Sequence, residues 1–419
     1  MTRPFLFLIM AACCGSLTAQ TAVAPAAGNG TEQDPWQIAS LENLYWIAAA
    51  DGVVPNPSRS LRAASCYIQT APIDASPTRT WFSGRGWDPI SNFSGFYDGQ
   101  GHYIDGLFIC DSLRSNVGLF GNTYDADIVD LGLSDVDIRG DEYVGALVGV
   151  ALGYHFNNTH TRISSCYSTG RVQGSRDTGG LIGFNDEGQV YFCYSKASVS
   201  SAGSYAGGLV GNNHRTVRDC YSTGPVSLRE GSGIHGLIGN VTGDVLACFW
   251  DVETSGQPDT LLSFTGAAGI TTAEMKTRST FQDAGWDLST RWGIYPALNE
   301  GYPHLRGLKI PGAATVRFEL TLPEGGTFDP QTDSVRITGS FFGWASPGTL
   351  PEQKMLRDGE SLLWYADLEL EPGTYQYKYF LNDGWENGEW DGDPARTAEI
   401  ASDTVFHNIW GSLSDVPDA

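Results

Sequence analysis

Apolar residues recur at a fixed period along residues 117–256. A five-residue phrase at Gly179–Gly183 (GGLIG) returns at Gly207–Gly211 (GGLVG) and at His235–Gly239 (HGLIG), with two looser copies before it. The leucines of the five copies step by 28, 34, 28 and 28 residues. They are Leu119, Leu147, Leu181, Leu209 and Leu237. A period of this size is typical of stacked-repeat folds.

Each repeat also carries two apolar positions that are three residues apart. The first set is Ile104, Ile128, Ile163, Val190, Val217 and Val245. The second set is Leu107, Leu131, Cys166, Cys193, Cys220 and Cys248. Because this spacing is constant, we expect both sets to face inward and to stack from coil to coil.

A coil of about 27 residues supplies three short strands, and parallel strands of successive coils lie ~4.8 Å apart. The pattern therefore predicts an all-β chain with a right-handed parallel β-helix, or β-solenoid, over residues 31–310. We expect the glycine pairs to form tight corners, where the absence of a Cβ allows a positive φ. The repeat that begins at Leu147 is longer, and its extra residues, 154–160, are either a contact loop or a neutral surface insertion.

The N-terminal residues predict export and a cap. Residues 1–19 read as a signal peptide with Arg3, an apolar run over 5–12 and an exit at Ala19. Acylation of Cys13 is the alternative, and either route predicts an extracellular or cell-surface protein. Residues 20–30 predict a flexible leader. Residues 31–50 predict a cap in which residues 41–48 form a helix with Ser40 as its N-cap. No stretch is long enough to predict a membrane-spanning segment.

The pattern changes after residue 310. Short runs of alternating apolar and polar residues, separated by turns such as Pro372-Gly373, fill residues 311–419. Such runs predict an immunoglobulin-like β-sandwich as a separate domain.

The charge of the chain limits the classes of partner that it can bind. The formal net charge of −23 disfavours nucleic acid and anionic lipid, which both need clustered Lys or Arg. Six cysteines follow the signal peptide: Cys66, Cys110, Cys166, Cys193, Cys220 and Cys248. Their spacing predicts neither a metal site nor a cofactor site. Stacked in-register side chains point the same way, which favours free thiols over disulfides and leaves both open.

Two stretches carry family resemblances. Residues 207–226, GGLVGNNHRTVRDCYSTGPV, resemble the GLUG repeat of bacterial surface and secreted proteins. Flanking segments extend this resemblance over about 30–308, and it implies a β-solenoid in an adhesion-like extracellular protein with no activity of its own.

The second resemblance covers about 315–411. ITGSFFGW (337–344) and PGTYQYKYFLNDG (372–384) are similar to the immunoglobulin-like modules that bind glycogen and starch. This resemblance implies a sugar site formed by Trp344, Lys378, either Trp385 or Trp390, and Asn408. An indole can stack on a pyranose while Lys and Asn bind its hydroxyls. Phe342 departs from the family, which more often has a polar residue there.

Catalytic motifs are missing from the sequence. The acidic pairs Asp141-Glu142 and Asp186-Glu187 stand on the coils, but adjacent strand residues face opposite ways, so neither pair predicts a two-carboxylate site. We therefore expect a non-catalytic binding or adhesion protein whose partner is a glycan, possibly an α-glucan. The alternatives are a carbohydrate-active enzyme with a catalytic β-helix, and a structural surface protein that binds no sugar.

Overall fold

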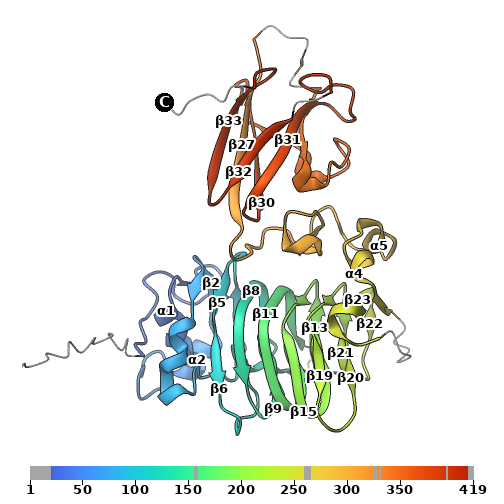
Figure 1. Ribbon diagram of the computed structural model, residues 1–419. Helices are drawn as coiled ribbons and strands as arrows, with labels where there is room; N and C mark the ends of the chain where they lie inside the picture. The colour runs from blue at the N-terminus through green and yellow to red at the C-terminus, as the bar shows by residue number, and fades with distance from the viewer. Residues whose placement is uncertain are drawn as a thin grey trace, which may run out of the picture.

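The computed structural model describes residues 20–154, 159–258, 266–324, 328–329, 332–392 and 395–413. The predicted signal peptide and most of the 154–160 insertion lie outside these residues. The chain forms a row of stacked coils and, above it, a smaller part made of two sheets (Figure 1). Strands dominate throughout, which confirms the all-β prediction.

The coiled part is built from parallel strands. Its strands are β1 (Trp36–Ile38), β2 (Cys66–Gln69), β3 (Ile73–Asp74), β4 (Phe96–Asp98), β5 (Tyr103–Asp105), β6 (Phe108–Cys110), β7 (Phe120–Tyr124), β8 (Asp127–Arg139), β9 (Glu142–Val144), β10 (Val148–Tyr154), β11 (Thr159–Gly179), β12 (Ile182–Asn185), β13 (Gly188–Tyr191), β14 (Tyr194–Ser195), β15 (Ser198–Gly207), β16 (Val210–Asn213), β17 (Val217–Arg218), β18 (Tyr221–Ser222), β19 (Val226–Leu228), β20 (Ile234–His235), β21 (Ile238–Val241), β22 (Val245–Leu246), β23 (Cys248–Asp251) and β24 (Ala267–Ile270). Each repeat pairs with the next in register; β12 pairs with β10 on one side and β16 on the other, for example.

The register confirms most of the first apolar set. Ile163 pairs with Ile128 on one side and Val190 on the other, and Val217 and Val245 continue the column. The inclusion of Ile104 was wrong, because Ile104 pairs with Leu133 while Tyr97 stands beside Ile128. Leu107 is likewise misplaced, since its neighbour Phe108 pairs with Asp137, well past Leu131. The early coils are irregular in length, so a fixed offset fails there.

The repeated glycines act by close packing and not by a positive φ. Neither Gly179 nor Gly180 has a positive φ, and a Cβ on Gly180 would collide with Oγ of Ser195 and the carbonyl of Gly208. One left-handed corner of each coil falls just before the second apolar set. Its residues are Asp130, Ser165, Phe192, Asp219 and Ala247, with φ of 51°, 54°, 54°, 53° and 49°.

The core of the coils contains a column of free thiols. Cys166, Cys193, Cys220 and Cys248 are fully buried, and all six described cysteines are free. The backbone N–H of Cys193 lies 3.3 Å from Sγ of Cys220, as in-register stacking requires. Burial raises the thiol pKa of the last three well above the ordinary value, which makes them unreactive core residues.

A short cap covers the first coil. Helix α1 (Leu41–Ala48) begins at Ser40, whose side chain accepts from the N–H of Asn43, and α2 (Arg59–Ala63) follows it. Residues 20–30, which we expected to form a flexible leader, pack on this cap. The N–H of Val23 donates to the carbonyl of Glu42 at 3.1 Å, and Asn43 Nδ2 donates to the carbonyl of Val23 at 3.0 Å.

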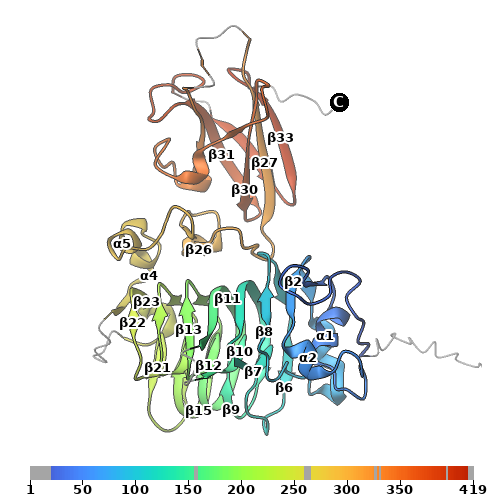
Figure 2. The same cartoon turned by 180° about the vertical axis from the view of Figure 1, so that it is seen from behind.

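Residues 271–308, here named the closing segment, form no further coil although we placed them in the β-helix. The segment contains α4 (Thr272–Met275), α5 (Arg278–Asp283), β25 (Trp292–Gly293) and β26 (His304–Leu305); α3 (Val252–Ser255) precedes it. It covers an outward column of stacked rings, Tyr167, Tyr194 and Tyr221, whose centroids are 5.1 and 5.0 Å apart. The two views of Figures 1 and 2 place it between the coils and the two-sheet part.

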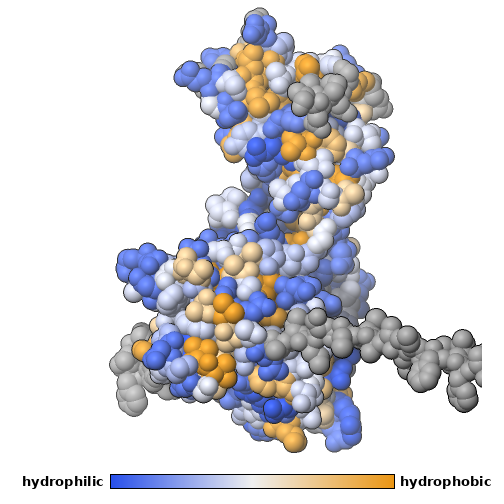
Figure 3. Space-filling model, turned by 90° about the vertical axis from the view of Figure 1, so that its left-hand side faces the viewer, coloured by the Kyte–Doolittle hydropathy of each residue, from blue (hydrophilic) through white to orange (hydrophobic). Residues whose placement is uncertain are grey.

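The two-sheet part has a four-stranded and a three-stranded sheet. The first runs in the order β29 (Leu356–Arg357), β30 (Leu363–Leu370), β27 (Ala314–Thr321) and β33 (Thr404–Ile409), and the second in the order β28 (Val335–Gly339), β31 (Gly373–Leu381) and β32 (Arg396–Ile400). Apolar residues of both sheets form one buried cluster, which includes Phe318, Ile337 and Tyr377. Seen from the side of the cap, hydrophobic residues on the surface of the molecule lie in small groups among hydrophilic ones (Figure 3).

Candidate functional site

Strand β31 presents its residues alternately to the core and to the outside of the second sheet. Tyr377 and Tyr379 face the core between the sheets. Lys378 and Phe380 therefore face outward, where the chain after β31 folds back over them. The N–H of Leu381 donates to the carbonyl of Asn387, and the N–H of Glu389 to that of Tyr379, so this return is hydrogen-bonded to the strand.

The returning chain places two tryptophans beside these outward side chains. The ring of Trp385 packs edge-to-face on Phe380 at 5.4 Å and remains 49% exposed. The ring of Trp390 lies 5.4 Å from Nζ of Lys378, a cation–π contact. Both tryptophans therefore belong to the same site, so the two alternatives given by the sequence, Trp385 and Trp390, do not exclude each other.

Trp344 reaches the site from the turn after β28. The short 3-10 helix η3 (Ser340–Phe342) ends at Gly343, and both Gly343 and Trp344 are left-handed, with φ of 59° and 55°. The N–H of Trp344 donates to the carbonyl of Gly339 at 2.9 Å, which closes the turn. The indole is left 37% exposed.

These side chains line a cleft of about 250 Å³ on the outer face of the second sheet. Its lining residues are Trp344, Lys378, Phe380, Trp385, Trp390, Asp391, Gly392 and Ala395. Four of the five predicted residues thus come together. Phe380 and Asp391 were missed, although the period-two alternation of β31 already places Phe380 on the side of Lys378.

The Lys378 ammonium is held in the wall of the cleft. It is only 8% exposed and donates to the carbonyls of Trp390 and Gly392. A lysine ammonium has three N–H donors, and these two carbonyls are its acceptors among the described residues. The third N–H of Lys378 has no acceptor among the residues that the structure describes.

Asn408 lies elsewhere, so its prediction as a sugar contact was wrong in geometry. It stands on β33 of the other sheet, and its Oδ1 accepts from the hydroxyls of Tyr377 (2.9 Å) and Tyr379 (2.7 Å). The side chain is buried between the sheets, on the opposite side of β31 from Lys378. Buried amides are usually spent on such internal hydrogen bonds.

A buried ion pair fixes the back of the cleft. Arg396 donates to both carboxylate oxygens of Glu389, and its guanidinium stacks 5.2 Å from the ring of Trp390. Burial raises the pKa of Glu389, while Arg396 acts in the opposite direction. Trp390 therefore contacts two cations, Arg396 and Lys378.

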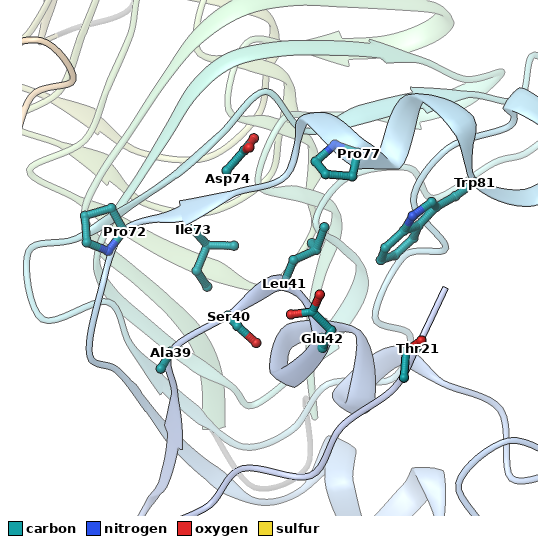
Figure 4. A pocket seen from close by; sticks show the side chains of 10 residues that line it. All are labelled: Thr21, Ala39, Ser40, Leu41, Glu42, Pro72, Ile73, Asp74, Pro77 and Trp81. Carbon is teal, nitrogen blue, oxygen red and sulfur yellow. The ribbon is translucent and has the colours of Figure 1, made fainter. Parts of the chain in front are cut away.

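A second cavity, of about 290 Å³, opens at the cap of the coils (Figure 4). Glu42, Asp74 and Trp81 contribute to its lining. Both carboxylates are exposed, while the Trp81 ring is buried and offers little stacking surface. This cavity is larger than the tryptophan cleft, but the cleft has the more specific chemistry.

In each acidic pair on the coils, the glutamate is bound to an arginine. Asp186 lies 3.1 Å from Nδ1 of His214, and Glu187 accepts from Nε of Arg215 at 2.5 Å. Glu142 pairs with Arg176 at 3.1 Å. Within the described ranges no three His, Cys, Asp or Glu side chains gather in a metal-binding arrangement. The helices in those ranges are also too short or too polar to cross a membrane.

Comparisons with known proteins agree with the repeats. The model of the GLUG motif matches residues 202–227, from β15 into β19. Halomucin of Haloquadratum walsbyi is 35% identical over 183 residues, which is 41% of this chain and 2% of halomucin. A putative Gly-rich membrane protein of Evansella cellulosilytica is 34% identical over 156 residues, 35% of this chain and 14% of that protein.

The chain thus spans only a small part of these relatives. Among solved structures, the gamma-CGTase of an alkalophilic Bacillus clarkii overlaps 26% of this chain and 16% of its own at 16% identity, with a TM-score of 0.18. A likeness at that level carries no argument about fold or activity. The coils therefore carry a GLUG motif, and the chain resembles segments of two much longer proteins.

Proposed function

We propose that the protein is an exported, non-catalytic binding protein that attaches to a glycan through the tryptophan cleft. One observation carries this proposal: two half-exposed indoles, Trp344 and Trp385, share a cleft with a wall-held ammonium, Lys378. Large exposed indoles are unusual on a soluble domain unless they meet a partner.

The chemistry of the cleft suits a neutral sugar. Indole faces stack on the apolar C–H face of a pyranose, and Lys378 and Asp391 can donate to and accept from its hydroxyls. An anionic or a purely apolar ligand would fit the cleft less well, because its described lining offers one cation, Lys378, beside one carboxylate, Asp391. Neutral α-glucan remains the first ligand to test, given the resemblance of residues 315–411 to glycogen- and starch-binding modules.

The relatives support a surface location. One is named halomucin and the other is named a putative Gly-rich membrane protein. A signal peptide over residues 1–19 supplies the export step in this proposal. Adhesion then follows if the coils form a spacer that presents the cleft.

The proposed fold assignment is a right-handed parallel β-helix over residues 31–270, followed by the closing segment, and an immunoglobulin-like sandwich over 311–419. Parallel in-register pairing of successive repeats supports the first assignment. Two facing sheets around one core, with β28 and β31 antiparallel, support the second.

Affinity electrophoresis of the full chain in gels of glycogen, starch and cellulose tests the proposal. We expect retardation in at least one gel and its loss in Trp344→Ala and Trp385→Ala. Val405→Ala, which trims an exposed apolar side chain on β33 outside the cleft, is the matched control. Retardation that is absent in every gel, or equal in all variants, contradicts the proposal.

The enzyme alternative is tested on the same samples. The binding proposal predicts no new reducing ends when the retarding glycan is incubated with the chain. If the wild type releases reducing ends and Glu187→Gln does not, this result would instead support a catalytic site on the coils.

A further inference from the structure

The closing segment is fastened to the coils by hydrogen bonds to the tyrosine column. The hydroxyl of Tyr221 donates to the carbonyl of Pro303 at 2.5 Å and accepts from Asn299 Nδ2 at 2.9 Å. Lys196, from the neighbouring coil, pairs with Glu300 at 2.8 Å. The segment is therefore part of the coiled body and not a free linker.

The same segment reaches the turn that carries Trp344. The ring of Tyr295 packs edge-to-face on Phe342 at 5.2 Å and 89°, and its hydroxyl donates to the carbonyl of Glu369 at 3.1 Å. A Cβ on Gly343 would lie 3.5 Å from Cγ of Pro296. Phe342, the residue that departs from the sugar-binding family, is buried by this contact.

A second route leads from the closing segment to the other side of the turn. Arg306 pairs with Glu352 at 2.5 Å, and both side chains are largely buried. The next residue, Gln353, donates to the carbonyl of Ala345 at 2.8 Å and to Oγ1 of Thr338 at 3.1 Å. Ala345 directly follows Trp344, so the turn is held on both sides.

The conformation of this turn needs such support. A non-glycine residue with φ near 55° costs of order 1 kcal/mol, and it persists when the surroundings hold it there. Gly343 and Trp344 are left-handed in succession. Without the ring of Tyr295 below it, this turn would lose one of its two supports.

We propose that Phe342 and Tyr295 are positioning residues for the tryptophan cleft. Their contact lets the coiled body fix the turn that presents Trp344, so the two parts act as one rigid unit with one orientation of the cleft. The consequence for binding rests on the proposed glycan function, whereas the consequence for the turn does not.

Hydrogen exchange of the full chain, read by mass spectrometry over residues 338–347, tests the positioning role without any ligand. We expect Tyr295→Ala to speed exchange of these amides at least tenfold. Tyr295→Phe keeps the ring and should exchange like the wild type. Leu246→Ala, which trims an exposed side chain on the coils, is the control.

Unchanged exchange in Tyr295→Ala overturns the proposal. If circular dichroism shows that Tyr295→Ala is unfolded, Phe342→Leu replaces it in the test. This variant keeps an apolar side chain but removes the ring pair, and unchanged exchange over residues 338–347 would again overturn the proposal. In the retarding glycan gel, the faster-exchanging variant should also lose affinity about threefold or more. If the wild type is retarded in no gel, the proposed function fails, and the exchange result still decides the role of Tyr295.

Discussion

Non-glycine residues hold the left-handed corner that precedes the second apolar set, and glycine does so at none of its five positions. The column from Asp130 to Ala247 has φ between 49° and 54° throughout. At Asp219 the side chain is paired with Arg218, and at Phe192 the ring lies 5.5 Å from the guanidinium of Arg291. These contacts offset the conformational cost of the left-handed backbone. The neighbouring coils repeat the same corner.

Ala247 has the smallest side chain of this column and gives the cleanest test of the corner. Ala247→Val should lower the free energy of unfolding by roughly 1–2 kcal/mol, because a β-branched residue is strongly disfavoured at φ 49°. Ala247→Gly should match or slightly exceed the wild type. Urea titration measures both, and a valine variant as stable as the glycine variant would contradict this account of the corner.

We expect the buried His304 to make the packing of the closing segment sensitive to acid. It is buried against Tyr295 at 4.6 Å, and burial together with Arg306 lowers its pKa to about 3. The pKa of a histidine in the unfolded chain is ~6.5. Between pH 6.5 and pH 3 the unfolded chain therefore binds a proton at His304 that the folded chain does not bind, so the free energy of unfolding decreases as the pH is lowered.

This single group should remove roughly 2 kcal/mol of stability between pH 7 and pH 5. Denaturant titrations at the two pH values measure the loss. His304→Gln should show a smaller difference between them, and an identical difference in both proteins would exclude His304 as its source.

At the scale of the element, the repeated phrases fit one another across coils. Ser168 donates to the carbonyl of Gly180 at 2.8 Å, and its Oγ lies 3.0 Å from that of Ser195. The serine of one phrase therefore fills the space that the missing Cβ of the glycine pair leaves. This packing explains why Gly-Gly and Cys-Tyr-Ser recur together.

Gly180→Ala tests this packing. The new methyl would strike Ser195 and the backbone of Gly208, so we expect a loss of roughly 2 kcal/mol in the free energy of unfolding. Gly52→Ala is the matched control, because Gly52 has open space around it and no positive φ. Equal stabilities of the two variants in thermal or urea unfolding would argue against close packing as the role of the glycine.

The thiol column predicts a protected set of cysteines. In the folded chain at pH 8, Ellman's reagent should reach only the half-buried Cys66 and Cys110, because the side chains of the other four are fully buried and closed to the reagent. All six described thiols should react in urea. Rapid reaction of the column in the folded chain, or fewer than six in urea, would contradict free stacked thiols.

Strong periodicity made the coils from Ile128 to Val245 predictable, whereas the early coils were not. Offsets there depend on turn lengths that no local pattern specifies, which is why Ile104 was assigned to the wrong column. The cleft was largely predictable from the motif around Trp344 and Lys378. Asn408 was not, because only the packing of two sheets decides that its amide serves the hydroxyls of Tyr377 and Tyr379.

At the scale of the whole molecule, the coiled body and the two-sheet part meet through the closing segment. Its aromatic residues bury the tyrosine column on one side, and Tyr295 and Arg306 contact the second part on the other. In the function that we propose, the coils contribute stiffness and orientation, and the outer face of β31 contributes the binding chemistry.

The central claim is that the indoles of the cleft bind a glycan. Its most direct test is the dissociation constant of the full chain for the retarding glycan, compared between the wild type and Trp385→Ala. Loss of a central Trp from a binding site typically costs about 2 kcal/mol, so we expect affinity to fall at least tenfold while Val405→Ala stays at the wild-type value. Equal dissociation constants for wild type and Trp385→Ala would contradict the account.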